Sequence, residues 1–163
     1  MEQERILASS NVTAYYDRAN DWLYLDWHGE ITLDSIRSNC LQLVRCFLIK
    51  RYKRILNDNT NVTKVTPEVA PWLANDFLPY LRLLGIEYVA WICSSDMQIQ
   101  NDTETALEQL TSPVVALFDD MATAYEWLSA AKFQSPVMLN SPRSFTQIMT
   151  ALRERISSLG GTA

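Results

Sequence analysis

The sequence has few of the residues on which common catalytic and metal-binding motifs depend. Its 163 residues include one histidine, four glycines and three cysteines. The glycines are too scattered to form a phosphate-binding loop, and no G-x-S-x-G nucleophile elbow is present. One histidine and three cysteines without C-x-x-C spacing give no zinc pattern. We therefore expect a protein without enzymatic activity and without a cofactor.

The charge balance and the short apolar runs exclude further classes. The 19 acidic residues outnumber the 14 basic ones, and the formal charge of −5 disfavours general binding to nucleic acid. The longest apolar runs, near residues 88–93 and 114–118, are too short to span a bilayer. The first residues do not resemble a secretory signal. We expect a cytoplasmic protein without stable membrane anchoring, whose cysteines Cys40, Cys46 and Cys93 are reduced.

Apolar periodicity and turn residues predict an α/β domain over residues 1–131. The expected elements are antiparallel strands at 11–17 and 22–28, a helix from Thr32 to about 51, a strand at 53–57, a helix from Thr66 to Gly85, a strand at 88–94, a helix at about 102–110, a strand at 114–118 and a helix at 121–131. This order predicts a mixed sheet with an N-terminal antiparallel hairpin and later parallel strands, covered by helices.

Residues 58–79 carry specific expectations. Residues 58–65 are rich in Asp, Asn and Thr and are predicted to form a polar loop. Thr66, Pro67 and Glu68 have the order of a helix start, with Thr66 as the capping residue. Pro79 is expected to kink this helix, because its ring removes one backbone donor.

The end of the chain is expected to add one helix to the domain. Residues 132–141 have the character of a linker, and residues 142–159 form an amphipathic pattern. Its apolar stripe contains Phe145, Ile148, Met149, Leu152 and Ile156. The stripe predicts packing on its own domain or contact in a homodimer. A membrane surface is disfavoured because Glu154 opposes the arginines of the polar face.

Several short segments together resemble a known family. They are residues 26–30 (Asp-Trp-His-Gly-Glu), 55–58 (Ile-Leu-Asn-Asp), 66–68 (Thr-Pro-Glu), 72–73 with 77–79, and 118–120 with 125–128. In this order the chain resembles the small bacterial SpoIIAA-like proteins of the STAS class. The resemblance implies a SpoIIAA-like fold and a non-enzymatic regulatory or protein-interaction module, whose partner the sequence does not name.

The resemblance also points to one candidate regulatory segment. In anti-anti-sigma factors of that class, a phosphorylatable serine lies in the loop between the third strand and the second helix. The corresponding segment here lacks the Ser-Ser-Gly of that loop. Its threonines Thr60, Thr63 and Thr66 are the candidate phosphorylation sites. The same fold family also resembles the lipid-carrying CRAL-TRIO domains.

The acidic residues after the predicted strands allow two interpretations. If the strands are parallel, Asp58, Asp96, Asp119 and Asp120 lie at one sheet edge, where carboxylates are able to hold Mg²⁺. Alternatively, each acid caps a helix or forms a local turn. We favour the local interpretation, because it explains each acid separately.

An alternative function is a carrier of a small apolar ligand or lipid. It would use an aromatic-lined cavity, for which Trp27, Trp72, Phe77 and Tyr80 are the candidate lining residues. Such a carrier requires an enclosed cavity of roughly 300 Å³ or more, whereas core packing is the ordinary role of aromatic residues.

Two remaining polar features have structural explanations. His28 stands without a neighbouring nucleophile signature, so we expect a structural role. The basic run from Lys50 to Arg54 either binds phosphate, with Tyr52 as a stacking face, or complements the negative end of the preceding helix. The acidic protein around it favours the second interpretation.

Overall fold

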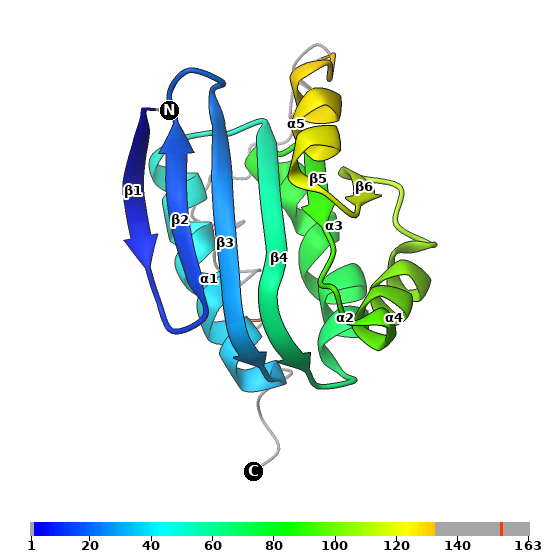
Figure 1. Ribbon diagram of the computed structural model, residues 1–163. Coiled ribbons are helices and arrows are strands. Elements are labelled where there is room, and N and C mark those ends of the chain that lie inside the picture. Colours follow the sequence, from blue (N-terminus) through cyan, green and yellow to red (C-terminus); the bar gives the residue numbers. More distant parts are fainter. Residues whose placement is uncertain (1, 133–153, 155–163) are drawn as a thin grey trace.

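The computed structural model describes residues 2–132 and residue 154. Strands and helices alternate after an N-terminal three-stranded meander (Figure 1). The elements are β1 (Gln3–Ala8), β2 (Val12–Asp17), β3 (Trp22–Ile31), α1 (Leu33–Ile49), β4 (Arg54–Val65), α2 (Val69–Trp72), the π-helical turn η1 (Leu73–Phe77), α3 (Leu78–Leu81), the 3₁₀ turn η2 (Arg82–Leu84), β5 (Tyr88–Ile92), α4 (Met97–Leu107), β6 (Val114–Phe118) and α5 (Met121–Ser129).

The strands of the described region form one sheet in the order β1-β2-β3-β4-β5-β6. β1, β2 and β3 are antiparallel neighbours, and β3, β4, β5 and β6 run parallel to one another. Parallel neighbours need a crossover, which α1, the α2–η2 segment and α4 provide. The mixed sheet predicted from the sequence is therefore confirmed, with an antiparallel start and a parallel second half.

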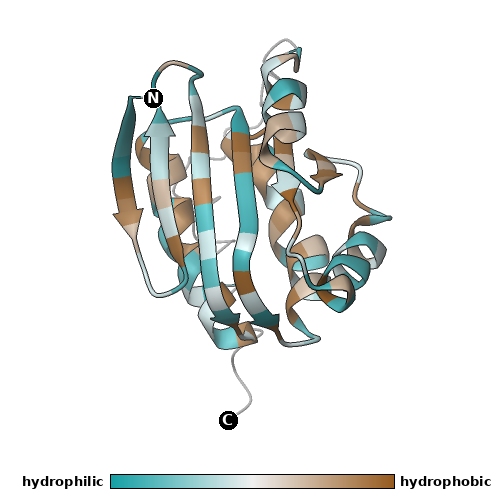
Figure 2. Ribbon diagram, viewed as in Figure 1, coloured by the Kyte–Doolittle hydropathy of each residue, from teal (hydrophilic) through white to brown (hydrophobic). Residues whose placement is uncertain are grey.

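The helices are divided unequally between the two faces of the sheet. α1, the α2–η2 segment and α4 pack on one face and enclose the larger core. α5 lies on the other face, where it buries a smaller cluster (Figure 1). Figure 2 shows hydrophobic stretches beside hydrophilic ones along β3 and β4. Successive side chains point to opposite faces, so Leu23 enters the larger core and Trp22 the smaller cluster. The smaller cluster contains Trp22, Leu56, Ala90, Ile92, Ala124 and Leu128.

Helices α1 and α5 begin at residues whose side chains cap them. Thr32 caps α1 in a reciprocal pair with Ser35: the Ser35 amide donates to the threonine hydroxyl over 3.2 Å, and the Thr32 amide donates to the serine hydroxyl over 3.0 Å. Asp120 caps α5 by accepting from the Thr123 amide over 2.9 Å. Both helix starts agree with the sequence analysis, which placed them at Thr32 and after Asp120.

The predicted interruption at Pro79 is also present. The helical segment between β4 and β5 does not run through as one α-helix, because the wider turn η1 ends at Phe77 and α3 restarts with Pro79 in its first turn. The segment ends at Gly85, which adopts a φ of +98° that suits a residue without a side chain.

Two expectations are wrong, and one strand was missed. Strand β1 was not predicted, since its residues lack the alternation typical of a half-buried strand. Residues 58–65 are not a loop but the second half of β4, which stays paired with β3 up to Val65. Thr66 does not cap α2: the N-cap is Glu68, without a side-chain hydrogen bond, and the Thr66 hydroxyl is buried without a partner in the described part of the chain.

The sequence also carried expectations about the cysteines and about the end of the chain. Cys40 and Cys93 are buried, Cys46 is half-buried, and all three are free thiols. Within the described residues, no helix combines the length and the apolar character that a membrane span requires. The linker at 132–141 and the apolar stripe of the last helix lie outside the described residues, except for Lys132.

Candidate functional site

The sheet face that carries α5 is covered only in part. α5 packs over the side chains of β4 and β5, while in Figure 1 the front of β1, β2 and β3 is crossed by no described helix. The alternation of side chains places one row from each of β2, β3 and β4 on this uncovered area. We call it the open sheet face, and it consists of Thr13, Tyr15, Tyr24, Asp26, Asp58 and Thr60.

Two tyrosines form the aromatic part of the open sheet face. Tyr15 on β2 and Tyr24 on β3 lie directly opposite each other in the antiparallel ladder. Their ring centroids are 5.9 Å apart with an interplanar angle of 23°, which is a stacked arrangement. Both side chains are half-buried, so the pair still presents aromatic surface to the outside.

Tyr24 is anchored to the neighbouring strand. Its hydroxyl donates a hydrogen bond of 3.0 Å to the carboxylate of Asp58 on β4. The other carboxylate oxygen of Asp58 accepts from the amide and the hydroxyl of Thr60 over 3.0 and 2.8 Å. Burial raises the pKa of Tyr24 well above its ordinary value, and the negative charge of Asp58 raises it further. Tyr24 is therefore held as a neutral donor, and its ring position is fixed.

A second carboxylate lies next to this group. Asp26 follows Tyr24 on the same face of β3 and stands opposite Asp58 in the parallel ladder. The Asn61 side-chain amide donates to Asp26 over 3.3 Å. The open sheet face thus combines flat aromatic rings with the half-buried carboxylate of Asp26, whereas the carboxylate of Asp58 is buried and already accepts from Tyr24 and Thr60. This combination suits a planar cation such as an arginine side chain, which stacks on rings and pairs with carboxylates.

The four acids that we considered for metal binding do not converge. Asp96 caps α4 by accepting from the amides of Gln98 and Ile99 over 2.9 and 3.1 Å. Asp120 caps α5, and Asp58 serves Tyr24 and Thr60 as described. Among residues 2–132 no group of three or more acids, histidines or cysteines is arranged to hold a metal ion. A shared magnesium site built from Asp58, Asp96, Asp119 and Asp120 is not found.

The three candidate phosphorylation sites do not share a loop. Thr60 and Thr63 are exposed residues of strand β4, and Thr66 follows the strand half-buried. Thr60 is the one that touches the open sheet face, through its hydrogen bond to Asp58. The serine-type loop of the resemblance has no counterpart here, because β4 pairs with β3 along this segment.

The aromatic residues considered for ligand binding are separated. A cavity of about 70 Å³ lies between the sheet and the helices α1 to α4, and Trp27 and Phe77 line it. Trp72 and Tyr80 are not among its lining residues. The volume is well below the roughly 300 Å³ at which ligand pockets usually begin. The cavity therefore does not support the carrier of a lipid-sized ligand.

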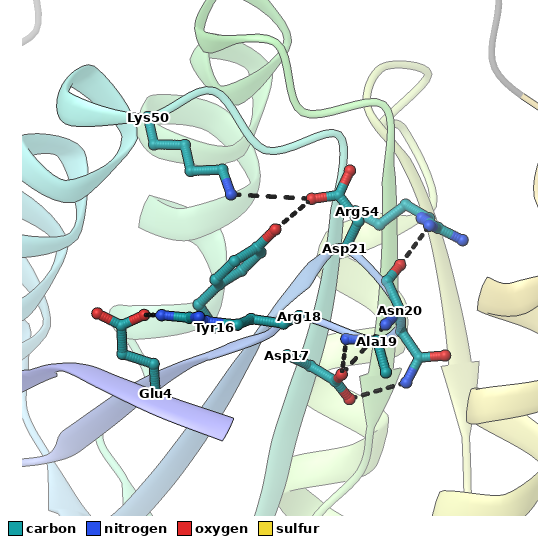
Figure 3. Close-up of polar contacts among 9 residues, drawn as sticks. All are labelled: Glu4, Tyr16, Asp17, Arg18, Ala19, Asn20, Asp21, Lys50 and Arg54. Atoms are coloured by element: carbon teal, nitrogen blue, oxygen red, sulfur yellow. Dashed lines mark hydrogen bonds and ion pairs between the residues drawn. The ribbon is translucent and has the colours of Figure 1, made fainter. Parts of the chain in front are cut away.

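In the basic run from Lys50 to Arg54, both end residues contact the turn between β2 and β3. Figure 3 shows Lys50 beside Tyr16 and Asp21, with its ammonium 3.5 Å from the ring centroid and 3.9 Å from the carboxylate. The Arg54 guanidinium donates to the carbonyl oxygen of Asn20 in the same turn. Tyr52 is buried. The run thus fastens the turn to the end of α1 and the start of β4, and Tyr52 offers no free stacking face.

The remaining candidates add no site. His28 is half-buried on β3, where its amide donates to the Asn11 carbonyl over 2.9 Å and its carbonyl accepts from the Asn11 side chain over 3.0 Å. These contacts are structural. The candidate dimer face lies outside the described residues and consists of Phe145, Ile148, Met149, Leu152 and Ile156.

Similarity to known proteins is found among solved structures. No protein-family model matches the sequence, and no curated protein matches it. Among solved structures, the chain is similar to an uncharacterized protein from the DUF3478 family with a SpoIIAA-like fold, from Shewanella loihica PV-4. The two are 18% identical with a TM-score of 0.48, and the match covers 76% of this chain and 99% of that chain. The SpoIIAA-like fold expected from the sequence is also the fold described for this neighbour.

Sequence reasoning missed the open sheet face. Tyr15 and Tyr24 were assigned to the predicted hairpin, but their pairing depends on the register that the turn sets. The sequence did indicate this pairing. Tyr15 and Tyr24 lie at the same distance from the centre of the predicted turn, and a symmetric hairpin places such residues opposite each other. Asp58 was considered as a metal ligand at a strand end, whereas it lies inside a longer strand beside Tyr24.

Proposed function

We propose that the chain is a non-enzymatic protein-interaction module with a regulatory role, and that the open sheet face binds a cationic segment of its partner. The observation that carries this proposal is the stacked pair Tyr15–Tyr24 beside the carboxylates of Asp26 and Asp58, on a face that α5 leaves uncovered. Tyrosine is enriched at interface positions that contribute most of the binding energy.

The charge of the chain favours a cationic partner. The formal charge is −5, and the open sheet face contributes the half-buried acid Asp26. Electrostatic complementarity speeds association and selects partners of opposite charge. An arginine stacked on Tyr15 would reach the half-buried carboxylate of Asp26, which accepts its fork of donors. The absence of a nucleophile signature in the sequence supports a binding role rather than catalysis.

The proposal is tested by comparing three variants for binding of proteins from the native cell. Tyr15→Ser removes half of the aromatic pair, and Asp26→Asn removes one charge without changing the shape. Glu126→Gln is the matched control, because Glu126 is an exposed acid on α5 outside the open sheet face. We expect the first two variants to lose about tenfold or more in affinity for the captured partner, as central interface residues do.

The salt dependence of this binding provides a second readout. Binding of the wild-type protein should weaken as the salt concentration rises, and the Asp26→Asn variant should show a smaller dependence. If both open-face variants bind like the Glu126→Gln control, or if salt has no effect on any of them, the partner does not bind here through cationic groups.

A further inference from the structure

The cavity between the sheet and the helices on the α1 side combines apolar side chains with buried polar ones. It holds about 70 Å³ and is bounded by β3, β4 and β5 on one side and by α1, the helical segment after β4, and α4 on the other. Its lining is mostly apolar, and none of its lining residues carries a charge. The polar lining residues are Ser94 after β5, Gln100 and Thr103 on α4, and two amides from the same face of β4, Asn57 and Asn59. Both are buried, with exposed fractions of 5% and 8%.

Each of the two amides has one half of its hydrogen-bonding capacity unused. The Asn57 side-chain oxygen accepts from the Trp27 indole over 2.7 Å, but its NH₂ group donates to no other residue in the described part of the chain. The Asn59 NH₂ group donates to the Ile92 carbonyl over 3.1 Å, while its oxygen accepts from no described residue. Buried polar groups of native proteins nearly always have a partner, because leaving one unpaired is unfavourable.

We infer that this cavity binds a small neutral alcohol, with its apolar part among the core side chains and its hydroxyl between Asn57 and Asn59. A hydroxyl is the group that both accepts a hydrogen bond and donates one. It therefore matches an unused NH₂ donor and an unused oxygen acceptor on one wall. This site is separate from the open sheet face, which lies on the other side of the sheet.

The lack of charged lining residues and the small volume of the cavity limit which ligands fit. A carboxylate or an ammonium group would lose its hydration without gaining an ion pair, since no charged residue lines the cavity. A single water needs about 10–15 Å³ of such space, so 70 Å³ accommodates about five water-sized groups. A molecule of about five heavy atoms fits this limit, whereas a long acyl chain does not.

The inference is tested with three small probes of matched size. 1-Butanol, pentane and butyrate are titrated into the full chain, and the side-chain NH₂ signals of Asn57 and the indole N–H signal of Trp27 are followed by NMR. We expect saturable shifts with 1-butanol. Pentane should bind about 2- to 10-fold more weakly, which is the usual net contribution of one hydrogen bond. Butyrate should give no saturable shift.

Three variants separate binding in the cavity from an effect on folding. Asn57→Leu should remove the preference for 1-butanol over pentane. Because it also leaves the Trp27 indole unpaired, Ala106→Leu serves as a second variant, in which an added side chain fills the cavity from α4 and abolishes binding of both probes. Ala122→Leu on α5 is the control and should bind like the wild type.

Two results would overturn the inference. One is the absence of saturable shifts with 1-butanol in the folded wild-type chain. The other is a set of shifts that Ala106→Leu leaves unchanged, because the alcohol would then bind elsewhere. Binding of proteins at the open sheet face is independent of both results, so failure here leaves the proposed function standing.

Discussion

The hydroxyl of Tyr24 on β3 donates a hydrogen bond of 3.0 Å to the carboxylate of Asp58 on β4. This contact ties two parallel neighbours together on the face that α5 leaves open. It also orients the ring of Tyr24 for stacking against Tyr15. The same contact has a consequence for titration, because a tyrosine beside a carboxylate resists the loss of its proton.

The first prediction concerns this titration. Because the pKa of Tyr24 lies above the ordinary tyrosine value of about 10, the folded protein keeps a proton that the unfolded chain loses. The stability that this provides is full below pH 10 and decreases as the pH rises above it. Asp58→Asn should lower the pKa of Tyr24 partway, since burial remains. Absorbance titration at 295 nm, with Tyr24→Phe to assign the signal, measures this. An unchanged titration in Asp58→Asn would mean that the contact does not form.

A second prediction contrasts two threonines near helix starts. Thr32→Ala removes the cap of α1 and should lower the free energy of unfolding by about 0.5–2 kcal/mol. Thr66→Val replaces a buried hydroxyl that has no partner in the described chain, so it should leave stability unchanged or raise it slightly. Denaturant unfolding of both variants tests this. If Thr66→Val lowers the midpoint as much as Thr32→Ala does, Thr66 makes a contact that the structure lacks.

The sequence predicted the fold best where local chemistry and tertiary structure agree. Strand β6 and helix α5 were placed closely, because Asp120 separates a short apolar run from a helical pattern. The second half of β4 was misassigned since Asp, Asn and Thr also favour turns. In the structure the hydrogen bonds of β3 decide its conformation. Local propensity does not contain this long-range pairing.

The candidate site was less accessible to sequence reasoning than the fold. The Tyr15–Tyr24 stack depends on the exact register of a hairpin, and the neighbourhood of Tyr24 and Asp58 depends on a parallel pairing across 34 positions of the chain. The cavity beside Asn57 arises from how the helices pack on the sheet. The spacing of apolar residues along the sequence does not indicate a cavity of this kind.

A third prediction concerns the attachment of the β2–β3 turn. Arg54 donates to the Asn20 carbonyl and, over 3.2 Å, to the Leu128 carbonyl, and its guanidinium lies 5.3 Å from the centroid of the Trp22 ring. Arg54→Lys should lower the free energy of unfolding by about 1–3 kcal/mol, because one ammonium does not replace this planar fork. Arg18→Lys is the control and should cost much less than Arg54→Lys, since its ion pair with Glu4 is exposed. Equal losses in calorimetry would contradict the role of Arg54.

A fourth prediction ranks the reactivity of the thiols. Burial raises the pKa of all three cysteines, and Cys40 is the most deeply enclosed. At pH 8 a polar disulfide reagent should label Cys46 first, Cys93 more slowly, and Cys40 only as fast as the protein unfolds. In denaturant all three should react at once. Mass spectrometry of the labelled peptides gives the order, and simultaneous labelling in the native protein would contradict the packing of α1 against the sheet.

The most direct test of the open sheet face is site-specific photo-cross-linking in the native cell. A photoreactive phenylalanine analogue is placed at position 15 in one protein and at position 97 in another. Met97 is 67% exposed at the start of α4, on the opposite side of the sheet. We predict a covalent adduct with one defined protein from position 15, which Asp26→Asn diminishes, and none from position 97. Adducts from position 97 alone, or none from position 15 in a cell where the partner is captured by other means, would contradict the account.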